Sequence, residues 1–311
     1  MGNCCSEGYC DKRASSNPSI MKTPVELQVL PHDIGGHGPP MLLVEEVKDI
    51  PDYRTSNVMM TLQSLPNFIY DADHPEDTQL PYFPPYKLVE NNAIYQGQWK
   101  NGQRHGRGEQ YWPDGSIYMG YWRNNMANGK GRFIHAEGDI YEGEWLDGRA
   151  HGNGIYVSTD GTRYEGEWFE DKQHGLGTQS WPNGDRYEGY FEMGKRQGQG
   201  KMVWGDGSAY QGEFLAGNIH GQGIYYWPDG RVYKGQWVGN FMNGKGEFAW
   251  PDGRTYIGEY ADDKRDGYGE MTYADGTKYR GYWKNGKEYG EGVYLDERGN
   301  PIPKKSMVEQ H

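Results

Sequence analysis

The stretch YEGEWLDGRAHGNGIYVSTDG, residues 141–161, decides the fold of this chain. It begins at Tyr141 with the pattern Tyr-x-Gly-x-Trp, whose named residues are two apart and share one face if the segment is a β-strand. The turn sequence LDGRAH follows, and a second segment then places Gly152, Gly154 and Tyr156 on one face in the same way. The stretch therefore predicts a β-hairpin with aromatic rings and glycines on one side.

The pattern Tyr-x-Gly-x-aromatic recurs nine times, at a constant interval of 23 residues and without insertion or deletion. Its first residues are Tyr95, Tyr118, Tyr141, Tyr164, Tyr187, Tyr210, Tyr233, Tyr256 and Tyr279. Fixed self-similarity at such a period is typical of repeat architectures. Several units close with WPDG, as at 112–115, where proline presets φ and glycine supplies a positive φ.

We therefore predict an all-β fold, in which residues 91–299 form an elongated, single-layer, twisted antiparallel sheet of about nine hairpins. Glycine (48 residues), tyrosine (26) and tryptophan (11) are abundant, while only 35% of residues are hydrophobic. A ring can lie across the bare backbone of a glycine on the neighbouring strand, so we expect rings over glycines to form the core. The ninth unit lacks Pro-Asp-Gly and should cap the sheet, with 300–311 as a tail.

The unit YxGxW…GxGxxxxxxDG resembles the MORN repeat (membrane occupation and recognition nexus), over residues 91 to about 299. The resemblance implies an elongated antiparallel sheet that serves as a spacer or as a binding surface for proteins, and in some members for lipids. Junctophilins, radial spoke head subunits of cilia, protist cortex scaffolds and plant phosphatidylinositol phosphate kinases carry such repeats. Where a member is an enzyme, an attached domain supplies the activity, and no such domain is visible in this sequence.

Composition and charge exclude several classes of function. The net charge of −12 argues against a nucleic-acid groove and a broad polybasic membrane patch. No apolar stretch approaches the 18 residues of a transmembrane helix, and the N-terminus lacks the apolar core of a secretory signal. We expect no enzymatic activity and no cofactor.

Two recurring sets of polar residues have a structural interpretation. Four histidines precede the first glycine of a Gly-x-Gly pair, at one repeat phase that disperses them, and are interpreted as polar turn residues rather than metal ligands. They are His105, His151, His174 and His220. The glutamates of the YEGEW motifs alternate with the rings and should form a solvated face. They include Glu142, Glu144, Glu165 and Glu167. The Gly-x-Gly pairs are not phosphate loops, because no strand-to-helix transition accompanies them.

A second set of rings occurs six residues after the first glycine of each Gly-x-Gly pair. Six of the nine positions are aromatic, and we call them the aromatic ladder: Trp112, Trp181, Trp204, Trp227, Trp250 and Tyr273. One interpretation is that they belong to the core. The other is that they line an open groove of the one-layer sheet, where a partner helix or extended segment binds.

The first 90 residues lack the 23-residue pattern and hold 11 of the 17 prolines. Residues 11–90 are predicted to be mostly flexible. Their two apolar stretches, 41–50 and 55–70, are expected to dock on the first repeats.

Residues 1–10 begin with MGNCCS, which matches the M-G-x-x-x-[ST] signal for N-myristoylation of Gly2. One myristoyl chain binds membranes only marginally, so a second signal is expected. The nearby charges cancel, which leaves Cys4 and Cys5 as palmitoylation sites, with Cys10 a weaker candidate. The alternatives are an unmodified N-terminus and a zinc or redox role, and the second lacks the C-x-x-C spacing.

The sequence thus predicts a non-enzymatic, lipid-anchored scaffold whose sheet binds a protein partner and links a membrane to the cytoskeleton. The expected location is the cytoplasmic face of the plasma membrane or of a ciliary or cortical membrane. The alternatives are a phospholipid-binding module, a regulatory subunit of a lipid kinase and a structural axonemal subunit. Self-association into a homodimer stays open.

Overall fold

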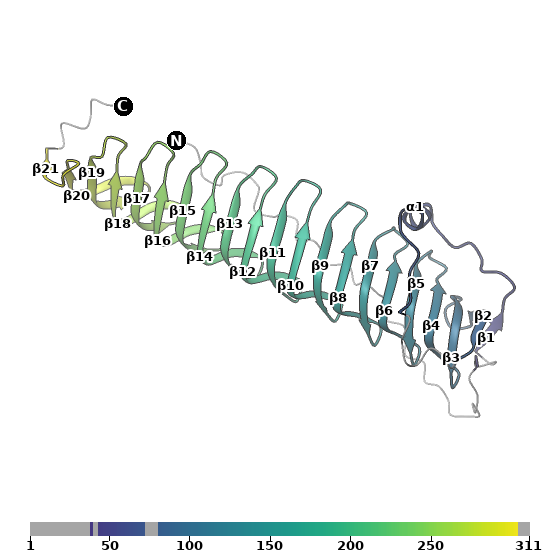
Figure 1. Ribbon diagram of the computed structural model, residues 1–311. Helices are drawn as coiled ribbons and strands as arrows, with labels where there is room; N and C mark the ends of the chain where they lie inside the picture. Colours follow the sequence, from purple (N-terminus) through teal and green to yellow (C-terminus); the bar gives the residue numbers. More distant parts are fainter. Residues whose placement is uncertain (1–37, 40–42, 72–79, 304–311) are drawn as a thin grey trace. The chain divides into compact units, whose positions relative to one another are not determined.

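The computed structural model describes residues 38–39, 43–71 and 80–303 (Figure 1). These residues form 21 strands of one antiparallel sheet and one helix, which confirms the prediction of an all-β, single-sheet fold. The chain divides into two compact units. Of the described residues, those up to 182 form the N-terminal unit and those from 183 onward form the C-terminal unit.

In each unit, every strand pairs with the next one along the chain. The N-terminal unit contains β1 (Val44–Glu46), α1 (Ser56–Ser64), β2 (Tyr82–Leu88), β3 (Ile94–Lys100), β4 (Gln103–Tyr111), β5 (Ile117–Arg123), β6 (Met126–Ile134), β7 (Ile140–Leu146), β8 (Arg149–Val157), β9 (Arg163–Phe169) and β10 (Lys172–Ser180).

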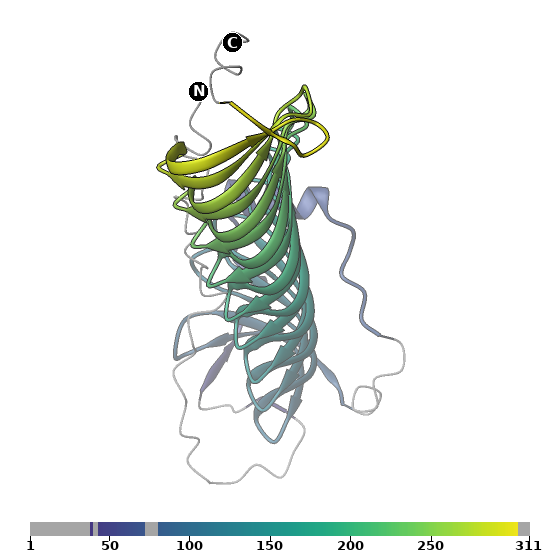
Figure 2. The same ribbon diagram turned by 90° about the vertical axis from the view of Figure 1, so that its left-hand side faces the viewer.

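The C-terminal unit continues the same pattern. It contains β11 (Arg186–Glu192), β12 (Lys195–Val203), β13 (Ala209–Leu215), β14 (Asn218–Tyr226), β15 (Val232–Val238), β16 (Phe241–Ala249), β17 (Thr255–Ala261), β18 (Lys264–Thr272), β19 (Lys278–Lys284), β20 (Lys287–Leu295) and β21 (Pro301–Ile302). Its successive hairpins are turned slightly with respect to one another (Figure 2), as the intrinsic twist of β-strands requires.

Each repeat is a hairpin in which glycine pairs with glycine. In β7 and β8, Gly143 lies opposite Gly154 and Tyr141 lies opposite Tyr156. The hairpin closes at Asp147-Gly148, where both residues have positive φ, +49° and +81°. This is the turn type whose twist matches that of the flanking strands.

The tyrosine that begins each repeat lies across the glycine pair of its own hairpin. A Cβ atom added to Gly154 would lie 2.4 Å from the Tyr141 hydroxyl oxygen. The hydroxyl group donates a hydrogen bond to the Glu144 carbonyl oxygen at 2.9 Å. The ring of Tyr141 also meets two tryptophans edge-on, with centroids 5.0 Å away at Trp145 and 5.1 Å away at Trp168 of the next repeat. The core is thus the layer of rings over glycines that the sequence predicts, and we call this side of the sheet the ring face.

The turns between repeats within each unit share one geometry, including the turn of the last repeat. The Gly115 amide donates to the Trp112 carbonyl oxygen at 3.0 Å, and Gly115 has φ +100°. Although the ninth unit lacks Pro-Asp-Gly, its Gly299 amide donates to the Asp296 carbonyl oxygen in the same way, at 3.0 Å. The short strand β21 then pairs with the end of β20, where Pro301 lies opposite Leu295.

Two strands precede the repeats, in a region predicted from the sequence to be mostly flexible. Strand β2 pairs with β3, the first strand of the repeats, and β1 pairs with β2. The register of β2 shifts between Phe83 and Tyr86, at its two prolines. Proline donates no ladder hydrogen bond and is tolerated at bulges and edges, so β2 can still cover β3.

Side chains at some hairpin tips tie one repeat to the one before it. The Asp171 carboxylate accepts a hydrogen bond from the Ala150 amide at 2.8 Å, and the Asn125 side chain does the same for the Arg104 amide at 2.8 Å. Burial raises the pKa of the Asp171 carboxyl group, although the Ala150 amide opposes the shift. At this position a charged acceptor is therefore less favourable than a neutral one.

The central glycine pair gives the first test. Gly154→Ala should destabilise the protein by about 2–4 kcal/mol, because the new methyl group must displace the Tyr141 ring. Gly148→Asn is the control, since a Cβ at Gly148 meets nothing within 4 Å and asparagine tolerates a positive φ. Thermal and urea unfolding measure both variants. Equal stability of the two would contradict the role assigned to the glycine pair.

The hairpin-tip carboxylate gives a second test. A raised pKa means that Asp171 favours folding most at low pH and loses this contribution as the pH rises through its folded-state pKa. Asp171→Asn should therefore match the wild type in acid and become more stable than it toward neutral pH. Asp275→Asn should show the opposite sign, because the Thr277 hydroxyl lowers the pKa of Asp275. Melting temperatures measured from pH 3 to pH 7 would refute this account if the two variants changed in parallel.

Candidate interaction surfaces

The aromatic ladder lies at the turns that join consecutive repeats, on the ring face. All six of its rings are half-buried, so they are neither core residues like the repeat tyrosines nor free in solvent. In the N-terminal unit, Trp112 packs edge-on against Phe133, with ring centroids 5.7 Å apart. In the C-terminal unit, the Tyr273 hydroxyl donates to the Glu288 carboxylate at 3.1 Å. The ladder thus combines partial burial with an accessible edge.

Three members of the ladder are connected into one continuous row of rings. Trp204, Trp227 and Trp250 are bridged by Tyr225 and Phe248, which come from β14 and β16. Neighbouring centroids along the row are 5.3, 4.5, 5.1 and 4.4 Å apart. The two bridging rings were not among the predicted site residues, because their participation depends on the strand register.

Charged residues flank this row. The Arg231 guanidinium lies over Trp227 at 5.2 Å, and that of Arg254 lies over Trp250 at 5.3 Å. Each arginine also pairs with the aspartate of its own turn, at 2.7 and 2.8 Å. A partner at this row would therefore meet aromatic surface together with both signs of charge.

The other side of the sheet, which we call the opposite face, carries the glutamates that alternate with the rings. Some of them have a structural role that the sequence did not reveal. The second strand of each hairpin contains a β-bulge at the first glycine of its Gly-x-Gly pair, as at Gly152 with φ +58°. Glu144 accepts a hydrogen bond from the Asn153 amide within this bulge, at 3.2 Å.

The interpretation of the histidines as turn residues is wrong. His151 lies inside β8, directly before the bulge, and His105 is buried inside β4. The turn has only two residues, Asp147 and Gly148, so strand pairing already resumes at Arg149 and the histidine lies within the strand. In the part of the chain that the structure describes, no group of histidine, cysteine or carboxylate side chains is arranged to hold a metal ion.

The opposite face of β4–β6 is covered by residues 53–71, which include the apolar stretch 55–70 that was expected to dock on the first repeats. Helix α1 buries Val58 completely between Ile117 and Ile134, which lie on β5 and β6. Its N-cap, Thr55, accepts from the Val58 amide at 3.2 Å and donates to the Ala136 carbonyl oxygen at 2.6 Å. Figures 1 and 2 both show the helix beside these strands.

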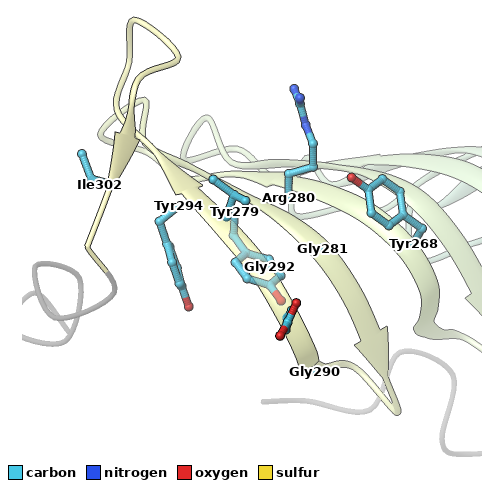
Figure 3. Close-up of a pocket in the computed structure, with 10 residues that line it drawn as sticks. Tyr268, Tyr279, Arg280, Gly281, Gly290, Gly292, Tyr294 and Ile302 are labelled. Atoms are coloured by element: carbon cyan, nitrogen blue, oxygen red, sulfur yellow. The ribbon is translucent and has the colours of Figure 1, made fainter.

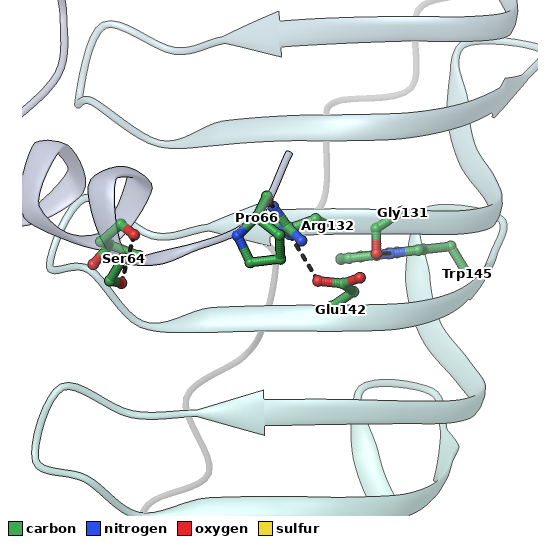
Figure 4. A network of polar contacts seen from close by, with 7 residues as sticks. Ser64, Pro66, Gly131, Arg132, Glu142 and Trp145 are labelled. Atoms are coloured by element: carbon green, nitrogen blue, oxygen red, sulfur yellow. Dashed lines mark hydrogen bonds and ion pairs between the residues drawn. The ribbon is translucent and has the colours of Figure 1, made fainter. Parts of the chain in front are cut away.

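The chain continues from α1 as an extended segment held by polar contacts. The Arg132 guanidinium donates to the Pro66 carbonyl oxygen and to the Glu142 carboxylate, both at 2.7 Å (Figure 4). It also lies 5.7 Å from the centroid of the Phe68 ring. These contacts show that the opposite face can bind an extended peptide segment, here one from the same chain.

The end of the C-terminal unit holds a pocket of 540 Å³ (Figure 3). Tyr268, Arg280 and Val293 line it from the opposite face, and Tyr279 and Tyr294 from the ring face. No helix in the described residues is long and apolar enough to cross a membrane. The predicted lipidation sites, Gly2, Cys4 and Cys5, lie outside the described residues.

The MORN repeat model matches the chain nine times. The matched residues are 95–117, 118–140, 141–163, 164–186, 187–209, 210–230, 233–253, 256–278 and 279–300. The chain belongs to the MORN-repeat family. The nine matches coincide with the nine hairpins, so the MORN unit of the sequence is also the unit of the structure.

Other comparisons add less to this MORN-repeat chain. No curated protein matches it. Among solved structures it is similar to the TCP10 domain of Danio rerio CPAP, at 15% identity and a TM-score of 0.35, covering 72% of this chain and 98% of that one. It is also similar to the SAS-4 (dCPAP) TCP domain of Drosophila melanogaster in complex with a proline-rich motif of Ana2, at 14% identity and a TM-score of 0.32, covering 63% and 99%.

Covering of the opposite face by residues 53–71 can be tested at Val58. Val58→Asp should detach α1, because a carboxylate cannot be buried without a partner. Protease cleavage within 55–71 should then accelerate at least about tenfold while the repeats stay folded. Met60→Asp is the matched control, since Met60 on the same helix is 62% exposed. Cleavage of Val58→Asp at the wild-type rate would refute the packing described.

Proposed function

We propose that this protein is a non-enzymatic scaffold, anchored to a membrane by lipids on Gly2, Cys4 and Cys5, whose MORN sheet binds a protein partner. The observation that carries the proposal is the binding of residues 53–71 to the opposite face, since the sheet already receives a helix followed by an extended segment. A sheet that is built from rings and glycines on one face leaves positions on the other face free to vary.

The aromatic ladder supplies a second surface for the partner. Rings that are half-buried contribute contact area with little loss of conformational freedom, and partially exposed aromatic clusters are typical of binding surfaces. The row from Trp204 to Trp250 therefore forms the centre of the ring-face binding site that we propose. A helix or an extended segment would lie along the row, perpendicular to the strands of the hairpins.

The anchor depends on two lipids. Myristate on Gly2 gives only marginal membrane binding, and palmitate on Cys4 and Cys5 makes the attachment stable. These lipids would hold the scaffold at the cytoplasmic face of the plasma membrane or of a ciliary or cortical membrane. There the MORN sheet would link the membrane to the cytoskeleton.

Lipid labelling and fractionation in cells test the anchor. Gly2→Ala should abolish incorporation of both a myristate and a palmitate analogue, because palmitoylation requires prior membrane contact. The double variant Cys4→Ser, Cys5→Ser should keep the myristate, lose the palmitate and move mostly to the soluble fraction. If the wild type and both variants partition identically, the anchor is refuted.

A separate experiment tests the ladder. The variant Trp204→Ser, Trp250→Ser should lose a partner that cross-links to the wild-type protein, and Tyr226→Ser should keep it. Tyr226 is a suitable control because it is an exposed ring in the same region but on the opposite face. If only Tyr226→Ser lost this partner, the binding site would lie on the opposite face, and the proposed site at the ladder would be refuted.

A further inference from the structure

One position of the MORN unit alternates between two kinds of side chain. It is the third residue after the first tyrosine, on the opposite face. Six repeats carry glutamate or glutamine there: Gln98, Glu144, Glu167, Glu213, Gln236 and Glu259. The side-chain oxygen of five of them accepts the amide hydrogen of the β-bulge, at 2.6–3.2 Å. The other three repeats carry Tyr121, Tyr190 and Tyr282 instead.

The first of these tyrosines is covered by the chain itself. Tyr121 is only 2% exposed. Its ring meets the ring of Tyr70 edge-on, with centroids 5.5 Å apart, and its hydroxyl donates to the Asp71 carbonyl oxygen at 3.2 Å. On the flanking strands, Arg107 lies over the Tyr70 ring at 5.4 Å and the Lys130 ammonium pairs with the Asp71 carboxylate at 2.8 Å. A tyrosine at this position thus packs against an aromatic residue that is followed by a charged one.

The tyrosine of the last repeat occupies the same repeat position but has no cover in the described structure. Tyr282 is 57% exposed, and it lies opposite Tyr268 on β18 and Tyr289 on β20, which are 48% and 64% exposed. The rings of Tyr268 and Tyr282 meet edge-on with centroids 5.3 Å apart. Val293, on the same face of β20, is 48% exposed. Figure 3 shows that Arg280, which borders this patch, projects from the sheet on the side away from Tyr294.

A comparison of equivalent repeat positions around Tyr121 and Tyr282 identifies the chemistry of an occupant at Tyr282. Tyr268 pairs with Tyr282 as Arg107 pairs with Tyr121, so an aromatic ring stands where the first site has a guanidinium. Glu291 occupies the repeat position of Lys130, between the two glycines, so the charge that meets the occupant is reversed.

We propose that the opposite face of β18–β20, centred on Tyr282, binds an extended segment of a partner protein in which an aromatic residue is followed by a basic one. The aromatic residue packs edge-on against Tyr282 beside Tyr268, and the basic residue pairs with Glu291. The proposal rests on the scaffold role proposed above, and it identifies a second partner site and the sequence that this site selects. Residues 66–71 of the chain do not suit it, because Asp71 would face Glu291.

Two labelled peptides test the site against the full-length protein by fluorescence anisotropy. One is residues 65–71 (LPNFIYD), and the other is the same peptide with Asp71→Lys. We expect the lysine peptide to bind at least about fivefold more tightly at low salt, because its ammonium group is attracted by the Glu291 carboxylate. Tyr282→Ala should weaken its binding at least about tenfold through the loss of ring contact. Tyr190→Ala is the matched control, being at the same repeat position and 51% exposed, and should leave binding unchanged.

Reversal of the charge gives the sharpest result. In Glu291→Lys the preference should invert, so that the aspartate peptide binds more tightly. The proposal is overturned if Tyr282→Ala binds both peptides like the wild type, or if Glu291→Lys keeps the original preference. It is also overturned by a concentration-dependent dimer that Tyr282→Ala dissociates, since the occupant would then be a second copy of the chain. None of these outcomes affects the lipid labelling or the ladder variants, so failure here and failure of the scaffold proposal can be told apart.

Discussion

The rest of the structure depends on the contact between a tyrosine ring and a pair of glycines that face each other across a hairpin. The ring needs the space that a Cβ atom would take, as at Gly154, where Tyr141 occupies it. Each glycine weakens its strand when considered alone. The buried ring and its two edge-on aromatic neighbours offset that loss, so the hairpin forms a core without any layer packed above it. Because the next repeat provides the second neighbour, each hairpin also stabilises the one before it.

This way of building a core leaves the two faces of the sheet with different freedom to vary. The ring face keeps its first tyrosine and its glycine pair in every repeat, and the position four residues after the tyrosine is always aromatic, as at Trp168, Phe191 and Tyr260. The opposite face has to satisfy a single obligation, the amide hydrogen of the bulge, which Glu144 meets from the neighbouring strand. All other positions there can change from repeat to repeat. Recognition that differs along the chain can therefore evolve on this face while the ring face maintains the core.

Much of the repeat region could be predicted from the sequence because its signals are local. The two-residue spacing from Tyr141 to Trp145 predicts the strand, and the glycines of the turns mark its ends. The β-bulge could not be predicted, since the positive φ of Gly152 depends on pairing across strands. Strand β2 was missed because its prolines argue against pairing, and only a bulge accommodates them. Similarly, the place of Tyr225 within the aromatic row follows from register, which a single strand does not reveal.

The alternation between glutamate and tyrosine at the bulge position connects stability with recognition. A glutamate there closes its own repeat by accepting the bulge amide, and it offers little apolar surface. A tyrosine gives up that bond and presents a ring at the centre of the opposite face, which is a cost unless something packs on it. At Tyr121 residues 70 and 71 supply that packing. The same substitution recurs at Tyr282 with two more exposed rings beside it, and the partner segment that we propose would cover those rings.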